Sequence, residues 1–138
     1  MHQEKSCGAV IFKSGKSTDY LLLHYESGHW DFAKGHVEKD ESEEQTVTRE
    51  VLEETGLRNI RFVKDFRERI KYFYRRHGTT VSKEVVFYLI QANEDQEVKI
   101  SGEHVGFEWL SYQQAYQRLT YKNAKDILRK AERCLSRV

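Results

Sequence analysis

Apolar positions along the chain recur with two periods, which predict short β-strands interleaved with two substantial helices. The segment 19–25 (DYLLLHY) is continuously apolar, as is typical of a strand covered on both faces, and 84–92 (EVVFYLIQA) is apolar enough to be central. Further strands are predicted at 5–12, 57–66, 68–74 and 104–110. A short β-like VKI also lies within the polar loop 93–102, and the polar segment 75–80 is predicted to turn at Gly78.

Two segments carry the signals of helix ends. In the first, Asp40 or Ser42 serves as N-cap, Glu43 or Gln45 closes a capping box, and Gly56 ends the helix. Ser111 with Gln114 predicts a short helix, and residues 121–137 predict an amphipathic one. We expect its inner side to carry Ala124, Ile127, Leu128, Ala131 and Leu135.

Strands between two helical segments predict an α/β fold with a mixed sheet between helical layers. The chain has 138 residues, no internal repeat and no linker, so we expect a single domain over residues 1–138. No run of apolar residues is long enough to span a membrane, and the first residues lack a signal-peptide pattern. We therefore expect a cytoplasmic protein. Free thiols at Cys7 and Cys134 fit such a compartment, and a disulfide between them is the alternative that the sequence leaves open.

Charge is distributed unevenly although the formal net charge is only +1. Residues 37–54 have a net charge of −6, residues 61–83 of +6, and residues 111–138 of +5. An acidic segment flanked by basic ones fits a small polyanion held through cations, whereas ordinary mixing of surface charges would give the same counts.

The acidic charge concentrates on one side of the first predicted helix. At about 100° per residue, Glu50, Glu53 and Glu54 fall within an arc about 100° wide. Val47, Val51, Leu52 and Thr55 fall on the adjacent arc and are expected to face the core. Such crowded carboxylates form either a solvated acidic face or a site for a hard, oxygen-binding cation such as Mg²⁺ or Mn²⁺.

The frame around these acids decides between the two interpretations. Gly35 is followed after five residues by Glu41, and after seven more by the run REVLEETGL at 49–57. This frame resembles the Nudix box, and each fixed position of that family pattern is filled. The resemblance implies a Nudix-type α/β/α sandwich, in which the box forms a loop, a helix and a loop at the sheet edge. It also implies a hydrolase that depends on a divalent metal.

Segments outside the box narrow the resemblance to one branch. The run WDFAKGHVE at 30–38 is similar to the corresponding segment of asymmetrical diadenosine tetraphosphate hydrolases, although Phe32 and Ala33 stand where that branch usually has two prolines. Similarity continues through 66–72, through 83–89, and through Glu103-His104 with the following FEWL. Nearly the whole chain is covered.

The resemblance implies roles for particular residues. Glu50 and Glu54 would be the principal metal ligands, with Glu53 beside them and the Gly35 carbonyl completing the shell. The general base is left divided between Glu53 and another glutamate. Arg49 would hold the helix carboxylates in place, while Glu41 is expected to be structural.

Six further residues are candidates for the site: one glutamate, three basic residues and two tyrosines. Glu103 is a metal ligand or base by resemblance, or else an exposed turn glutamate. Lys34, His36 and Lys83 could contact phosphates, although surface lysines and structural histidines (His36 and His104) give the same pattern. Tyr72 and Tyr121 match positions that could sandwich an adenine ring, unless both pack in the core.

The sequence thus predicts a Mg²⁺-dependent pyrophosphohydrolase that splits diadenosine tetraphosphate, a small dinucleoside polyphosphate, into ATP and AMP. Within the enzyme class the alternatives are an RNA 5′-pyrophosphohydrolase, acting on capped or triphosphorylated ends, and a house-cleaning nucleoside triphosphatase. Outside it stands a Nudix module that senses a nucleotide without cleaving it. No membrane partner is expected, and the oligomeric state is left open.

Overall fold

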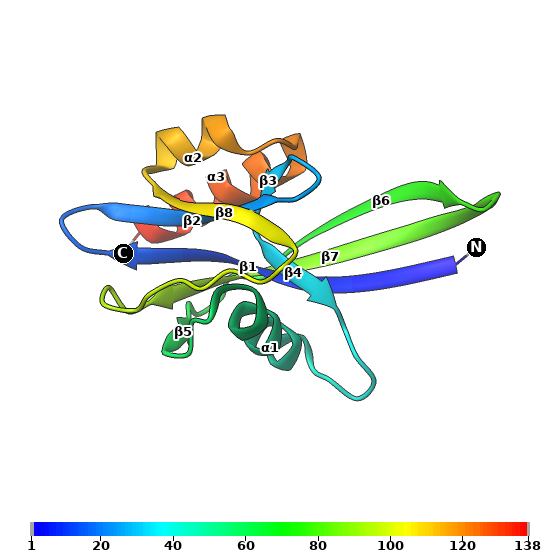
Figure 1. The fold of residues 1–138 in the computed structure, drawn as a ribbon, viewed down its shortest axis with the longest axis horizontal. Helices are drawn as coiled ribbons and strands as arrows, with labels where there is room; N and C mark the ends of the chain where they lie inside the picture. Colours follow the sequence, from blue (N-terminus) through cyan, green and yellow to red (C-terminus); the bar gives the residue numbers. More distant parts are fainter. Residues whose placement is uncertain (1, 138) are drawn as a thin grey trace.

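A computed structural model describes residues 2–137 and contains one eight-stranded mixed sheet between helical layers (Figure 1). The central path runs β3 (Trp30–Asp31), β2 (Thr18–Tyr25), β1 (His2–Ser14), β7 (Thr79–Ala92) and β5 (Ile60–Phe62). Beside this path, β4 (Ala33–His36) pairs with β1, β6 (Glu68–Arg76) with β7, and β8 (His104–Leu110) with β2. The α/β/α sandwich predicted from the sequence is confirmed.

Helices cover both faces of this sheet. Helix α1 (Glu43–Thr55) lies on one face, and α2 (Tyr112–Arg118) with α3 (Lys122–Ser136) lies on the other (Figure 1). The parallel pair β1 and β7 forms the middle, and its side chains alternate between the two layers. Cys7, Ala9 and Ile11 pack toward α1, whereas Val10 and Phe12 pack toward α3. The continuously apolar run of β2 is buried on both faces, as predicted.

Helix α1 begins and ends where its sequence signals indicate. Ser42, not Asp40, is the N-cap, and its side chain and that of Gln45 form the capping box. Gly56 ends the helix with a φ of 75°, a conformation that glycine adopts without steric cost. Val47, Val51 and Thr55 face the core as expected, but Leu52 is 36% exposed because it lies on the outer edge of that arc.

Strands β6 and β7 form a long hairpin that extends, together with the start of β1, beyond the helical layers (Figure 1). The hairpin turns through two residues, His77 and Gly78, which both have positive φ. Such a turn matches the right-handed twist of paired strands. Its tightness explains why β6 and β7 run further toward the turn than the polar sequence at 75–80 predicted.

Two expectations about secondary structure are corrected, and two short strands are added. Residues 98–100 form no strand, because Lys99 and Ser101 donate their backbone N–H groups to the carbonyls at the end of α1. Of the predicted strand 57–66, only β5 pairs with β7. The stretch before α1 contains the two short strands β3 and β4, whose few residues give no periodic signal. The other predicted strands and both helices of the C-terminal part are confirmed, with Tyr121 as the N-cap of α3.

Two smaller expectations concern membrane segments and thiols. Among the described residues, no helix is both long and apolar enough to cross a membrane. Cys7 and Cys134 are free thiols in the structure, and burial raises the pKa of the Cys7 thiol to about 11. Cys7 is therefore a protonated core residue near neutral pH.

Candidate active site

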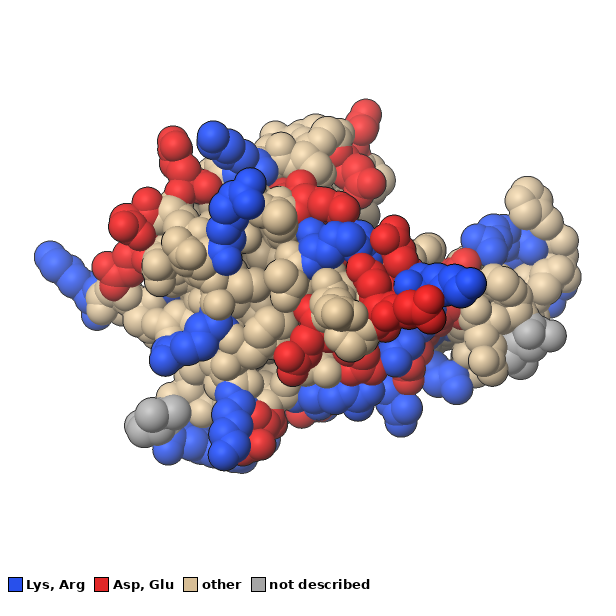
Figure 2. Space-filling model, turned by 90° about the horizontal axis from the view of Figure 1, so that it is seen from below, with Lys and Arg blue, Asp and Glu red and all other residues tan. Residues whose placement is uncertain are grey.

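Glu50 and Glu54 of α1 face a cleft of about 370 Å³ between the helix, β4 and the loop before β8. Acidic side chains gather on this face of the molecule, with Lys and Arg around them (Figure 2). Seven predicted site residues line the cleft: Lys34, Gly35, His36, Glu50, Glu54, Lys83 and Glu103. Tyr25 and Ser6 line it as well, although their sequence context had singled out neither.

Gly35 and Glu50 are in direct contact at the floor of the cleft. A Cβ atom at position 35 would stand 2.0 Å from the Glu50 carboxyl carbon, so only glycine leaves room for that carboxylate. Strand β4 carries Gly35 past the helix because its residues pair with β1, Gly35 opposite Cys7. The close approach of the Glu50 carboxylate thus explains why this fold requires glycine at position 35.

Arg49 binds the surrounding acids and one carbonyl. Its guanidinium donates to Glu41 at 2.7 Å, to Glu50 at 2.6 Å and to the His36 carbonyl at 3.0 Å. The hydrogen bond from Arg49 lowers the pKa of the Glu41 carboxyl to about 2, so Glu41 stays ionised. Glu41 precedes the helix and accepts these bonds, which agrees with its expected structural character.

Glu54 is the most deeply buried acid of the cleft. It accepts a hydrogen bond from the Lys34 backbone N–H at 3.3 Å, and its side chain is almost fully enclosed. Burial raises the pKa of its carboxyl, and the nearby Glu50 carboxylate raises it further. Two carboxyl groups in one dry cleft repel each other, and a cation between them would relieve that repulsion.

Glu53 and Glu103 lie at the margins. The Glu53 side chain is 55% exposed, does not line the cleft, and contacts Arg49 at 3.3 Å. Glu103 is an exposed residue that nevertheless lines the cleft from the opposite wall. The structure therefore brings Glu50, Glu54 and Glu103 together and leaves Glu53 outside, turned toward Arg49.

His104, next to Glu103, is fully buried. Its Nε2 is 3.8 Å from Glu54 and has no hydrogen-bond partner in the described part of the chain. Burial lowers the pKa of this imidazole, so it is neutral near pH 7. His104 packs behind the cleft rather than lining it, which fits the structural interpretation.

The oxygen donors of the cleft fit a hard divalent cation. Carboxylates and a backbone carbonyl are the ligands that Mg²⁺ and Mn²⁺ take, and the cleft contains no cysteine. Within residues 2–137, no three His, Cys, Asp or Glu side chains already stand in a closed metal shell. Because Glu50 is bound to Arg49 and Glu54 to Lys34, a cation would draw these carboxylates partly away from their present partners.

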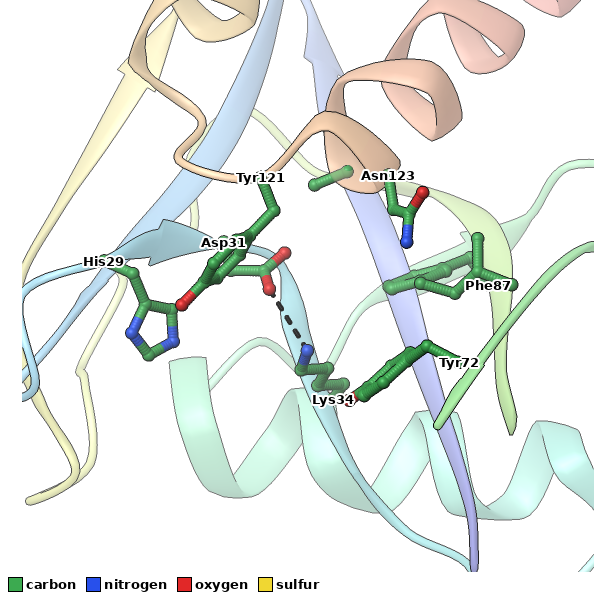
Figure 3. A pocket seen from close by; sticks show the side chains of 9 residues that line it. His29, Asp31, Lys34, Tyr72, Phe87, Tyr121 and Asn123 are labelled. Carbon is green, nitrogen blue, oxygen red and sulfur yellow. Dashed lines mark hydrogen bonds and ion pairs between the residues drawn. The ribbon is translucent and has the colours of Figure 1, made fainter. Parts of the chain in front are cut away.

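A second hollow, about 460 Å³ in volume, adjoins the cleft (Figure 3). Tyr72 of β6 and Tyr121, before α3, line it from opposite sides, with Asp31 and Asn123 between them. Tyr72 is 37% and Tyr121 is 51% exposed, so neither is a core residue. Lys34 lines both hollows and joins them.

Further polar residues at these hollows, among them His29 and Asp31, were not singled out from the sequence. His29 stacks on Tyr25 with ring centroids 4.5 Å apart, and its ring lies 5.5 Å from that of Tyr121. Asp31 is buried and accepts a hydrogen bond from Lys34 Nζ at 3.1 Å. The available signal was a run of polar residues inside an otherwise buried aromatic segment.

Lys83 and His36 complete the basic side of the cleft. Lys83 Nζ lies 3.1 Å from His36 Nε2, and burial lowers the pKa of the lysine. Lys83 of β7 is paired directly with Tyr72 of β6. These two neighbours line the cleft and the second hollow, respectively.

Comparison with known proteins agrees with this geometry. The NUDIX domain family profile matches residues 3–131, and the chain belongs to this family. It is 31% identical to the asymmetrical bis(5′-nucleosyl)-tetraphosphatase of Sus scrofa, over 95% of each chain, and 32% identical to that of Caenorhabditis elegans, over 91% and 92%. The crystal structure of a C. elegans Ap4A hydrolase binary complex superposes with a TM-score of 0.86 at 28% identity, covering 98% of this chain and 99% of that one.

The chain is thus a Nudix hydrolase homologous to the asymmetrical bis(5′-nucleosyl)-tetraphosphatases. Hydrolases of this family need a divalent metal ion, and these relatives act on small nucleotides. These similarities favour a pyrophosphohydrolase close to the Ap4A hydrolases over the three alternatives considered from the sequence, namely an RNA 5′-pyrophosphohydrolase, a nucleoside triphosphatase and a nucleotide-sensing module.

Proposed function

We propose that this protein is a Mg²⁺-dependent asymmetrical hydrolase that splits diadenosine tetraphosphate into ATP and AMP, with Mn²⁺ as a substitute ion. The observation that carries the proposal is the junction at Lys34 between an acidic cleft and a tyrosine-lined cavity. A nucleoside in the cavity would place its phosphates in the cleft. We propose further that the chain forms one domain and acts in the cytoplasm.

In this proposal Glu50, Glu54 and Glu103 hold the divalent ion together with the Gly35 carbonyl, and Glu53 joins them by turning from Arg49. When bound, the ion neutralises phosphate charge and lowers the pKa of the attacking water. Lys34, His36 and Lys83 donate to phosphate oxygens. Arg49 orients Glu50, and the general base is Glu53 or Glu103.

Tyr72 and Tyr121 receive the adenine in this proposal. Their rings stand on opposite sides of the cavity, and each offers an apolar face (Figure 3). Base–tyrosine stacking contributes about 1–3 kcal/mol per base. The tyrosines would therefore supply affinity, while the cleft supplies the chemistry.

The test is turnover of diadenosine tetraphosphate with Mg²⁺, with products separated by chromatography. We expect ATP and AMP, no reaction in chelator, and a loss in kcat on the order of 10³-fold for Glu54→Gln. Glu44→Gln is the matched control, because Glu44 is an exposed residue of the same helix, outside the cleft. In ¹⁸O-labelled water the label should enter AMP.

Other outcomes point elsewhere. Tight nucleotide binding without turnover in any divalent ion would identify a sensing module. Equal rates on all nucleoside triphosphates, in a panel with nucleotide sugars and RNA 5′ ends, would contradict the tetraphosphate assignment. Two ADP products, or label in ATP, would contradict the proposed direction of attack.

A further inference from the structure

Asp31 is the acid of the tyrosine-lined cavity. The lining contains one other ionised side chain, Lys34, together with aromatic, aliphatic, imidazole and amide groups. Asp31 itself is 3% exposed, and its carboxylate lies between Tyr121 and Lys34 (Figure 3). Strand β3 fixes it there, because Asp31 pairs with Leu23 of β2.

The protein supplies only part of what a buried carboxylate requires. Oδ1 accepts from the Phe32 backbone N–H at 2.8 Å, and Oδ2 accepts from Lys34 Nζ at 3.1 Å. A carboxylate has about four lone-pair sites, so these two bonds leave about half of its accepting capacity unused. A buried charge that is incompletely paired destabilises a fold relative to a neutral side chain of similar size. Apart from the ion pair with Lys34, the folded structure therefore gives no reason for an acid here.

The chemistry of a carboxylate defines what the cavity can take. An ionised carboxylate accepts hydrogen bonds and donates none, and it repels phosphate. Lys34 stands between Asp31 and the cleft, where Lys83 and His36 add further positive or donor groups. A nucleotide would thus be oriented with its phosphates toward the cleft and its N–H or O–H donors toward Asp31.

We propose that Asp31 is a specificity-determining residue, whose carboxylate accepts hydrogen bonds from donors of the nucleoside bound between Tyr72 and Tyr121. This inference rests on the proposed function. We assign this contact to one of two donors of an adenosine: the exocyclic amino group of the base or the ribose 2′-hydroxyl. Stacking on tyrosine accepts any base, so Asp31 would provide the selection that the two rings lack.

The experiment compares three substrates: diadenosine tetraphosphate, its analogue with purine riboside in both nucleosides, and its analogue with 2′-deoxyribose in both. The first analogue lacks the amino groups and the second lacks one hydroxyl donor per ribose. A hydrogen bond to a charged group corresponds to a factor of about 10 to 100 in kcat/KM. We expect wild type to discriminate by that factor against one analogue, and Asp31→Asn to reduce the discrimination to about 3-fold or less.

The pattern across substrates separates a contact from a structural effect. A purely structural role would lower kcat/KM by the same factor on all three substrates, and equal use of all three by wild type would equally overturn the proposal. Loss of discrimination against the purine riboside analogue identifies the base as the donor, and loss against the deoxy analogue identifies the ribose. Asp95→Asn is the matched control, since Asp95 is exposed and lines neither hollow.

Binding measurements on the wild-type protein test the role of Asp31 without turnover and without the Asp31→Asn variant. Calorimetry of AMP, purine riboside 5′-monophosphate and dAMP, without metal, repeats the comparison on the cavity alone. If wild type cleaves no dinucleotide yet binds AMP at least 10-fold more tightly than one analogue, the proposed function fails while the role of Asp31 stands. Equal binding of the three monophosphates by wild type overturns the role of Asp31 even if the enzyme is active.

Discussion

The acidic cleft and the tyrosine-lined cavity meet at Lys34, yet the chain builds them in different ways. Most of the cleft comes from residues 34–54, a single strand–loop–helix segment whose acids are ordered by helical spacing. The cavity takes its walls from β3, β6, β7 and the start of α3, which are far apart in the sequence. The difference indicates that chemistry here depends on one local motif, whereas substrate choice depends on tertiary packing.

Polarity separates the two regions as clearly as their construction does. Acidic charge is crowded in the cleft, where burial and the Glu50 carboxylate together raise the pKa of Glu54. The cavity offers the flat faces of Tyr72 and Tyr121, with one acid among them. Variants in the cleft should therefore act mainly on kcat, and variants in the cavity mainly on KM.

Gly35→Ala should break the cleft and leave the cavity intact. The added Cβ would overlap the Glu50 carboxyl, the mobile end of a side chain, so the helix can stay in place while the carboxylate leaves. We expect kcat to fall by about 100-fold or more, with a change in unfolding free energy of about 1 kcal/mol or less. Steady-state kinetics measures the change in kcat, and thermal unfolding measures the change in stability.

Gly106→Ala is the matched control, because a Cβ there meets only His24, at an ordinary 3.8 Å. A Gly35→Ala protein with unchanged kcat would show that Glu50 does not need its present position against β4.

Alanine at Tyr72 or Tyr121 should weaken the cavity alone. Loss of one stacking face should raise KM for diadenosine tetraphosphate about 10-fold, at roughly constant kcat. Phenylalanine at the same position keeps the face and should stay within about 2-fold of wild type. A fall in kcat with unchanged KM would place these tyrosines with the cleft instead.

The last prediction concerns the stability of the metal-free protein. The pKa of Glu54 is raised from 4.5 to about 9 by burial and by Glu50, so the folded chain keeps a proton that the unfolded chain loses as pH rises above 4.5. Stability from this group is present below pH 4.5 and is lost as pH rises toward 9. Between pH 5 and 8, wild type should lose on the order of 4 kcal/mol relative to Glu54→Gln, or about 12 °C in Tm.

Thermal unfolding in chelator over that pH range measures the difference, with Glu44→Gln expected to follow wild type. Parallel curves for wild type and Glu54→Gln would mean that the Glu54 carboxyl is already ionised without metal.

Local sequence determined most of the elements and the helical side of the cleft. Caps at Ser42 and Gly56, the spacing of Glu50 and Glu54, and the apolar run of β2 each depend on neighbours within a few residues, and such patterns are readable from the chain. The glycine before the helix was also readable, although its reason, the contact with Glu50, was not.

Tertiary structure decided what depends on distant partners. The exposure of Leu52 and the pairing of the short strands β3 and β4 follow from packing that no local period encodes. Asp31 shows the reason most clearly: its burial beside Lys34, opposite Tyr72, requires β3, β4 and β6 to converge. Helical spacing therefore specified the two helix acids that we propose as metal ligands, while long-range packing specified the cavity that would select the substrate.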